Sequence, residues 1–179
     1  MIKKCSGGPT KPEIIAISLL KLQLQSTDTM ADIGCGSGAV TIEAAKIAQH
    51  IYAIDHRSTA ISTAEYNLKE CGIKNVTLIE DEASIALEGM RIDCAFIGGT
   101  RQIEDSVNAS IKAGAKRIVV NAVRIETVAR TIQYMSSLNI FTEAVHVSIS
   151  KSYALEGETM FKPYNPVYIV TAATGGTQC

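Results

Sequence analysis

Two acidic residues on either side of a glycine-rich loop are the part of this sequence best suited to chemistry. Asp32 opens the segment Asp32-Ile33-Gly34-Cys35-Gly36-Ser37-Gly38, and Asp55 ends the next apolar stretch. Glycine residues allow positive φ angles and let a ligand approach the backbone without meeting a Cβ atom. The first amides of the helix expected after the loop have no intrahelical partners and point outward. The loop therefore predicts a pocket for a polar small molecule.

The positions of the acids indicate which small molecule would bind. S-adenosylmethionine has an amino-acid head with an ammonium and a carboxylate, and a ribose with two neighbouring hydroxyls. We expect Asp32 to balance the cationic head and the loop amides to meet the carboxylate. Asp55 is expected to accept hydrogen bonds from the ribose, as acids do in dinucleotide folds. After the third predicted strand, Glu82 and the amide of Ala83 would recognise the adenine, which His56 could flank.

NAD is an alternative ligand for the same loop. Gly34-x-Gly36-x-x-Ala39 also matches the dinucleotide fingerprint, and Asp55 suits an NAD ribose. Three features favour S-adenosylmethionine: NAD does not require Asp32, a capped helix precedes the first strand, and the last strands form a pair that a dinucleotide fold does not need.

Alternating helices and strands must position these residues. Apolar runs bounded by glycine predict strands, and apolar residues at helical spacing predict helices. Alternation of the two implies crossover connections and a mostly parallel sheet. After a helix that ends near residue 22, strands are expected over residues 30–34, 51–55, 76–80, 92–97 and 117–121, and helices over 39–49, 58–71, 101–113 and 126–138.

Both ends of the chain add to this pattern. Thr10 is expected to cap the first helix, with Pro12 in its first turn and Glu13 completing a capping box. Predicted strands over 141–149 and 167–172 have no helix between them, only a polar connection over 151–166, and must pair antiparallel. Together these elements predict a single α/β domain over residues 1–179 with a seven-stranded, mostly parallel sheet and a C-terminal antiparallel hairpin. This is the Rossmann-like fold of class I S-adenosylmethionine-dependent methyltransferases.

Composition argues against several other classes of protein. With 179 residues and 46% hydrophobic content, the chain suits one compact domain. Lys plus Arg is 17, Asp plus Glu is 18 and no basic run occurs, so no nucleic-acid partner is expected. No apolar run is long enough for a membrane span or a secretory signal. Five scattered cysteines suggest reduced thiols in a cytoplasmic protein, and the histidines show no metal-site spacing.

Several segments together resemble the small decarboxylating methyltransferases of anaerobic cobalamin biosynthesis, which act on cobalt-precorrin-6B at ring carbon 15. The resemblance covers nearly the whole chain and rests on Gly8-Pro9-Thr10-Lys11-Pro12-Glu13, Asp32 to Gly38, Ile97-Gly98-Gly99-Thr100, Val119-Val120-Asn121-Ala122-Val123 and Asn165-Pro166-Val167-Tyr168-Ile169.

The resemblance implies a corrin precursor as substrate, S-adenosylmethionine as cofactor, and loss of carbon dioxide from an acetate side chain. It implies a homotetramer to whose assembly the terminal hairpin, within residues 140–174, contributes. It also implies that residues 1–25 form a loop and helix over the cofactor, which Thr10 touches. Where carbon 5 of the ring is also methylated, a separate polypeptide is the expected partner.

These arguments together predict the residues of the site. The cofactor residues are Thr10, Asp32, Gly34, Cys35, Gly36, Ser37, Gly38, Asp55, Glu82 and Ala83. A flat macrocycle edged with carboxylates requires cations at the rim of the cleft and small or polar residues near the ring. The substrate residues are accordingly Lys11, Gly99, Arg101, Asn121 and Arg124, with Lys162 also within reach of the rim. No catalytic acid stands out: Glu104, Glu126 and Tyr153 are equal candidates, and the ring itself can accept electrons.

Two other function classes stay open. One is a class I methyltransferase for another small molecule or for RNA. Ile97-Gly98-Gly99-Thr100 stands where amino- and amide-methylating enzymes carry Asn/Asp-Pro-Pro-Tyr/Phe, which disfavours that chemistry. The other class is a non-catalytic subunit that holds a corrin intermediate. The intact pair Asp32 and Asp55 argues against it.

Overall fold

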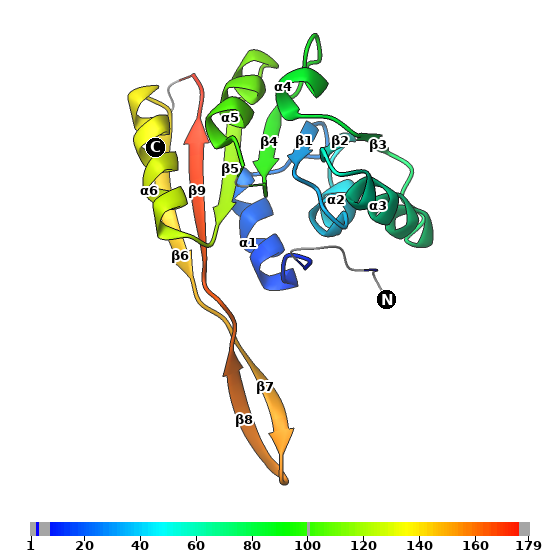
Figure 1. Cartoon of the computed structure of the whole chain (residues 1–179), viewed down its shortest axis with the longest axis vertical. Coiled ribbons are helices and arrows are strands. Elements are labelled where there is room, and N and C mark those ends of the chain that lie inside the picture. Colours follow the sequence, from blue (N-terminus) through cyan, green and yellow to red (C-terminus); the bar gives the residue numbers. More distant parts are fainter. Residues whose placement is uncertain (1–2, 4–7, 100, 176–179) are drawn as a thin grey trace.

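The computed structural model describes residues 3, 8–99 and 101–175 (Figure 1). Helices and strands alternate through most of this part of the chain. In order they are α1 (Pro12–Leu22), β1 (Thr29–Ile33), α2 (Ala39–Ala45), β2 (His50–Ile54), α3 (Ser58–Glu70), β3 (Val76–Ile79), α4 (Ala83–Ala86), β4 (Cys94–Ile97), α5 (Ile103–Lys112), β5 (Arg117–Ala122), α6 (Ile125–Ser137), β6 (Phe141–Val147), β7 (Ser150–Leu155), β8 (Glu158–Pro163) and β9 (Val167–Ala173).

Seven of these strands form one sheet in the order β3-β2-β1-β4-β5-β9-β6. The pairs from β3 through β5 are parallel, whereas β9 runs antiparallel to both β5 and β6. The predicted seven-stranded, mostly parallel α/β fold is therefore confirmed, as is the antiparallel pairing of its last two strands. α4 is a one-turn helix that the sequence analysis did not predict.

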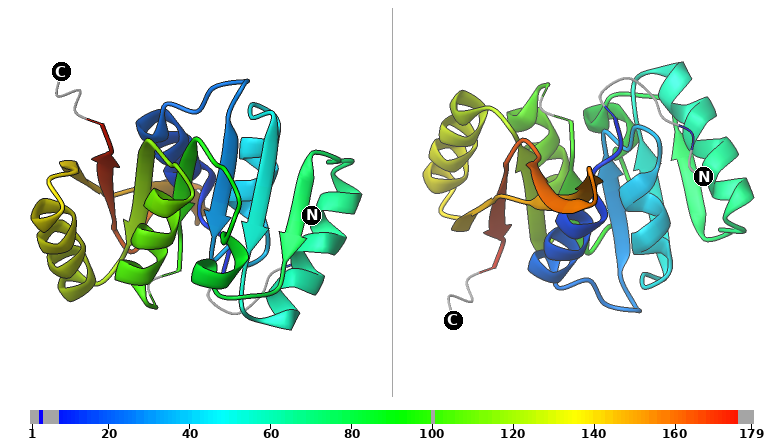
Figure 2. Two further views of the ribbon diagram at one scale, coloured as in Figure 1. Left: turned by 90° about the horizontal axis from the view of Figure 1, so that it is seen from above. Right: turned by 90° about the horizontal axis from the view of Figure 1, so that it is seen from below.

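Helices cover both faces of the sheet, as the end-on views show (Figure 2). Neighbouring residues of a strand point to opposite faces. Met30 of β1 therefore packs with residues of α1, α2 and α3, whereas Ala31 and Ile33 pack with residues of α4, α5 and α6. Because β1 lies between β2 and β4, the chain changes direction across the sheet beside β1. In such sheets ligands bind beyond the carboxyl ends of the strands at this point.

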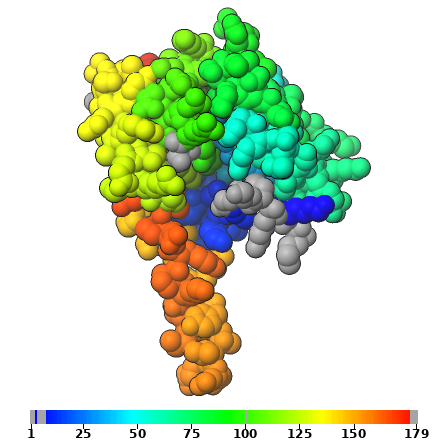
Figure 3. All heavy atoms as spheres, viewed as in Figure 1, coloured from blue at the N-terminus to red at the C-terminus, as the bar shows by residue number. Residues whose placement is uncertain are grey.

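Strands β7 and β8 form a separate hairpin that projects from the body of the molecule (Figure 3). The sequence analysis predicted only a polar connection over 151–166, which is wrong for these strands. Every residue of both strands is exposed. Without a buried face, no alternation of polar and apolar residues marks the strands. The turn between them has positive φ at both Glu156 (52°) and Gly157 (86°), as tight hairpin turns require.

The start of α1 also differs from the prediction. Lys11 is the N-cap residue and no side chain caps the helix, so the capping box proposed for Thr10 and Glu13 is wrong. Pro12 takes the first helical position, which suits its missing amide hydrogen. Glu13 instead forms a 2.7 Å ion pair with Lys151, which joins the first turn of α1 to β7. The segment around Thr10 therefore lies beside the base of the hairpin.

Candidate functional site

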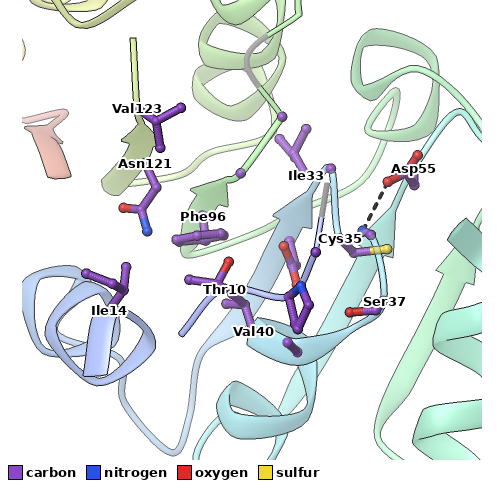
Figure 4. A pocket seen from close by; sticks show the side chains of 18 of the residues that line it. Thr10, Ile14, Ile33, Cys35, Ser37, Val40, Asp55, Phe96, Asn121 and Val123 are labelled. Carbon is purple, nitrogen blue, oxygen red and sulfur yellow. Dashed lines mark hydrogen bonds between the residues drawn. The ribbon is translucent and has the colours of Figure 1, made fainter. Parts of the chain in front are cut away.

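A cavity of about 670 Å³ lies at the carboxyl ends of β1, β2, β4 and β5 (Figure 4). Its volume is in the range of small-molecule sites, about 300–1,000 Å³. The loop after β1 and the ends of β2 and β4 line one part of it. The segment before α1, the end of β5 and the chain around β6 and β9 line the rest.

Nine of the ten residues predicted to bind the cofactor line this cavity: Thr10, Asp32, Gly34, Cys35, Gly36, Ser37, Asp55, Glu82 and Ala83. The tenth, Gly38, is not among the lining residues. It is the N-cap of α2 with φ of 78°, and a Cβ atom there would lie 3.4 Å from the Cβ of Ala64 in α3. Gly38 therefore permits the turn into α2 and the close packing of α3.

The glycine loop is held against two neighbouring strands. The amides of Gly34 and Cys35 both donate to the carbonyl of Ile54, over 2.8 and 3.0 Å. Gly34 has φ of 75°, and an added Cβ atom would lie 2.5 Å from the amide nitrogen of Gly99. A side chain at this position would overlap with backbone, so the loop after β1 and the turn after β4 meet only because Gly34 is glycine.

Asp32 places a carboxylate in the cavity that lacks a complete set of partners. The side chain is fully buried, and its Oδ2 accepts a hydrogen bond from the Thr41 hydroxyl. Oδ1 is buried without a hydrogen-bond partner. Burial raises the pKa of Asp32 to about 7, against the lowering effect of the Thr41 hydrogen bond and with a further increase from the negative charge of Asp55. An unpaired oxygen of this kind suits a cationic or hydrogen-bond-donating group of a ligand.

Asp55, by contrast, has donors on both of its oxygens. Oδ1 accepts from the backbone amide and Nε of Arg57 at 3.1 and 2.9 Å. Oδ2 accepts from the amide of Gly36 at 3.0 Å, drawn as a dashed line in Figure 4, and from Nη2 of Arg57 at 2.9 Å. Burial alone would raise the pKa of the Asp55 carboxyl. The hydrogen bonds from the Arg57 side chain and backbone and from Gly36, with the Arg57 charge, hold this pKa below its usual value.

The end of β3 supplies the adenine side of the predicted site. Asp81, Glu82 and Ala83 all line the cavity. The Glu82 amide donates to Oδ1 of Asp81 at 2.8 Å, and Glu82 is the N-cap of α4 without a side-chain hydrogen bond to the helix. His56 also lines the cavity, with its Nδ1 3.9 Å from Oδ1 of Asp55. This arrangement leaves the Glu82 carboxylate available beside a buried Ala83.

Of the residues predicted to bind substrate, Lys11, Gly99, Arg101 and Asn121 line the cavity. The structure does not bring the other basic or acidic candidates to its wall: Arg124, Lys162, Glu104, Glu126 and Tyr153 are not among the lining residues. Glu104 pairs with Arg130 at 3.1 Å, and Tyr153 and Lys162 belong to the projecting hairpin.

The C-terminal strands contribute a wall that the sequence analysis did not identify. Val147, Ile149, Tyr164 and Val167 line the cavity on the side of Asn121. The Nζ atom of Lys11 lies 4.7 Å from the centroid of the Tyr164 ring, within the range of a cation–π contact. Although Val167 lies in one of the segments that carry the resemblance, no sequence pattern predicted a site role for these four residues. They reach the cavity because β9 inserts between β5 and β6.

Asn121, at the end of β5, is held by a residue of α1. Its Nδ2 donates to Oγ of Ser18 at 2.9 Å, and Ser18 Oγ donates to the carbonyl of Ile14 at 2.8 Å. Ser18 is fully buried and Asn121 is 9% exposed. Oγ of Ser18 also lies 3.2 Å from Oδ1 of Asn121, so this hydroxyl contacts both polar atoms of the amide and holds the Asn121 side chain in place. Sequence spacing carries no sign of this contact, which joins residues 103 positions apart.

Residues 3, 8–99 and 101–175 contain no cluster of three or more His, Cys, Asp or Glu side chains that could hold a metal ion. No helix in these ranges combines the length and hydropathy needed to cross a membrane.

Comparisons with known proteins give this geometry a context. The profile of a family described as the precorrin methyltransferase domain matches residues 4–173. A probable cobalt-precorrin-6B C(15)-methyltransferase (decarboxylating) from Methanosarcina mazei is 54% identical over 175 residues, 94% of this chain and 95% of the relative. The solved structure of precorrin 8W decarboxylase from Methanobacterium thermoautotrophicum has a TM-score of 0.90 and 32% identity, covering 97% of both chains. Precorrin-6y C5,15-methyltransferase from Geobacter metallireducens GS-15 has the same TM-score and identity, covering 97% of this chain and 95% of that one.

Proposed function

Because this chain belongs to the precorrin methyltransferase family, we propose that it methylates carbon 15 of cobalt-precorrin-6B and removes carbon dioxide from an acetate side chain of that ring. The observation that carries the proposal is the two-part cavity. Acidic residues and the glycine loop line one part. Lys11, Arg101, Asn121 and an apolar wall line the other.

The residues of the first part fit S-adenosylmethionine. Asp32 would hold the ammonium of its amino-acid head through the unpaired Oδ1, and the loop amides would hold the carboxylate. Asp55 would accept from the ribose, while Glu82 and the amide of Ala83 would meet the adenine. Thr10 would close over the cofactor from the segment before α1. When bound, the cofactor supplies a methyl group attached to a sulfonium centre.

The second part fits the edge of a flat, carboxylated macrocycle. Lys11 and Arg101 are exposed cations at the wall of the cavity and suit the carboxylate side chains of such a ring. The wall of Val147, Ile149 and Val167 offers apolar contact to the ring itself. A macrocycle that carries all of its carboxylate side chains is too large for the cavity, so it would bind with one edge inside the cavity and the remainder at its opening.

Glycines lie where the two parts of the cavity join. Gly34, Gly98 and Gly99 line the cavity together, and the position of a Cβ atom at Gly99 is 3.5 Å from the Cα of Gly34. The absence of side chains there lets a methyl donor and an acceptor carbon approach each other. Alignment of two reactants can lower a barrier by about 7–11 kcal/mol. Methyl transfer would therefore depend on positioning by this chain rather than on acid–base residues.

Decarboxylation makes a different demand. Loss of carbon dioxide leaves an electron pair on the acetate carbon, which the conjugated ring can accept when it is protonated. Neither Glu104, Glu126 nor Tyr153 lines the cavity. We therefore propose that the substrate ring accepts the electron pair, and that the chain contributes by burying the acetate in the apolar part of the site.

Assembly into a homotetramer through the C-terminal strands of residues 140–174 is part of the proposal. The projecting hairpin exposes Tyr153, Leu155, Met160 and Phe161 by 44–66%, more apolar surface than an isolated arm would leave in water. Analytical ultracentrifugation of the chain and of its Phe161→Ser variant measures this: dissociation of the variant supports assembly through the hairpin, and a monomeric parent chain contradicts it.

A cytoplasmic location and a separate methyltransferase for ring carbon 5 complete the proposal. Cys71 and Cys94 of the described chain are free thiols, as is usual in a reducing compartment. The described residues form one α/β unit, and the cavity beside its glycine loop suits a single methylation.

Mass spectrometry of cobalt-precorrin-6B after incubation with the protein and S-adenosylmethionine tests the reaction. Gain of one methyl and loss of one carbon dioxide is expected. Asp55→Ala should abolish both changes, whereas Asp105→Ala, on the exposed surface of α5, should leave both intact. Methyl gain alone would assign the decarboxylation to another protein. An unchanged substrate, despite measured cofactor binding, would refute the corrin assignment.

A further inference from the structure

The side chain of Arg57 covers the carboxylate that is proposed to bind ribose. Nε of Arg57 lies 2.9 Å from one oxygen of Asp55 and Nη2 lies 2.9 Å from the other. This two-point contact has the geometry with which guanidinium groups bind carboxylates most strongly. Arg57 is the N-cap residue of α3 and lines the same cavity as Asp55.

A count of lone pairs shows that this contact and a ribose compete. A carboxylate has about four lone-pair sites, two on each oxygen. Asp55 already accepts four hydrogen bonds: two from the backbone amides of Gly36 and Arg57, and two from the Arg57 side chain. A vicinal diol that donates to both oxygens needs one site on each. Those are the two sites that the guanidinium uses.

We propose that the Arg57 guanidinium stands in for the ribose hydroxyls in the ligand-free protein and must leave Asp55 when the cofactor binds, so that Arg57 limits cofactor affinity. This inference rests on the proposed use of Asp55 for ribose recognition. It assigns to Arg57 a role that neither the glycine motif nor the two acids indicate.

The environment of the two side chains supports displacement of the arginine rather than the acid. The Asp55 side chain is 1% exposed, whereas that of Arg57 is 38% exposed. Because the Arg57 side chain is already partly in water, water can replace the hydrogen bonds that the guanidinium loses when it leaves Asp55. Asp55 cannot move out, and it keeps the amides of Gly36 and Arg57 as donors after the guanidinium leaves. Those amides would hold the carboxylate in the orientation that a diol needs.

Calorimetric titration with S-adenosylhomocysteine tests the proposal without any turnover. Arg57→Met should bind this ligand about fivefold more tightly than the parent chain, the effect expected from removing a partly exposed ion pair. Arg57→Lys should fall between the two, because an ammonium cannot bridge both oxygens. Lys69→Met, in the last turn of the same helix, removes an equal charge away from Asp55 and should not change the affinity.

An analogue that lacks the ribose hydroxyls sharpens the test. For 2′,3′-dideoxy-S-adenosylhomocysteine, the parent chain and Arg57→Met should bind with equal affinity, because nothing then requires Arg57 to leave. Unchanged or weaker binding of S-adenosylhomocysteine by Arg57→Met, with an unaltered circular dichroism spectrum, would overturn the proposal. So would a crystal structure of the complex in which Arg57 still bridges Asp55. Absence of binding by the parent chain would instead refute the proposed function.

Discussion

Replacement of Asp32 by asparagine should make the folded protein more stable at neutral pH while it weakens cofactor binding. Asp32 is fully buried, one of its oxygens has no partner, and its pKa is raised to about 7. The ordinary pKa of an aspartate carboxyl, which applies to the unfolded chain, is 3.8. Between these two pKa values the folded chain holds a proton that the unfolded chain releases, so stability is lost as the pH rises.

The magnitude follows from the difference between the two pKa values. Each pKa unit corresponds to about 1.4 kcal/mol, so between pH 5 and pH 7 the parent chain should lose about 2–3 kcal/mol of unfolding free energy through Asp32 alone. Asparagine at this position does not titrate. Between pH 5 and pH 7 the variant should therefore gain about 2–3 kcal/mol relative to the parent, and above pH 7 the difference should level off.

Urea titrations at pH 5, 6, 7 and 8, followed by circular dichroism, measure this difference. Asp105→Asn, the same chemical change at an exposed carboxylate of α5, is the matched control, and its free energy of unfolding should change with pH as that of the parent does. In the same samples at pH 8, Asp32→Asn should bind S-adenosylmethionine at least about tenfold more weakly, because it cannot pair with the ammonium. Parallel pH dependence of the parent and Asp32→Asn would show that the buried carboxyl is already ionised at pH 5, and would contradict the prediction.

Two further predictions concern the packing around the site. Gly34→Ala should lower the free energy of unfolding by about 2–5 kcal/mol in urea titrations, because its Cβ atom would overlap the backbone of Gly99. Gly72→Ala is the control: Gly72 has a similar φ of 67° but open space around it. Its substitution should cost only about 1–2 kcal/mol, the cost of a left-handed backbone conformation at a residue with a Cβ atom. Equal costs for the two would contradict the overlap. Ser18→Ala should lower turnover in the mass-spectrometric assay, because the substitution removes the contact with Asn121. In an Asn121→Ala background, Ser18→Ala should therefore have no further effect on turnover. Additive effects of the two substitutions would instead indicate independent roles.

The succession of strands and helices along the chain could be predicted from the sequence because it depends on local patterns. β1 to β5 are short apolar runs bounded by glycine or polar residues, and the helices between them, apart from the one-turn α4, repeat apolar residues at helical spacing. The glycine loop between Asp32 and Ala39 is equally local. Its place after a strand and before a helix follows from the order of residues alone, and so does its position at the carboxyl edge of a parallel sheet.

The hairpin of β7 and β8 could not be predicted from such local patterns. Both strands are exposed on both faces, so neither burial nor alternation identified them. The start of α1 was predicted wrongly for a related reason: Glu13 had a competing partner in Lys151, which lies far along the chain. Local capping rules cannot take account of a contact that the tertiary fold supplies.

Patterns within a few neighbouring residues predict the strands, the loop that opens the cavity and the two acids beside it. The surroundings of these residues instead depend on contacts between distant parts of the chain. The tertiary structure placed Arg57 on both oxygens of Asp55, left one oxygen of Asp32 unpaired, and set Ser18 against Asn121. Side-chain pairing and burial depend on the distances between elements, which the fold sets and the spacing of residues along the chain does not record.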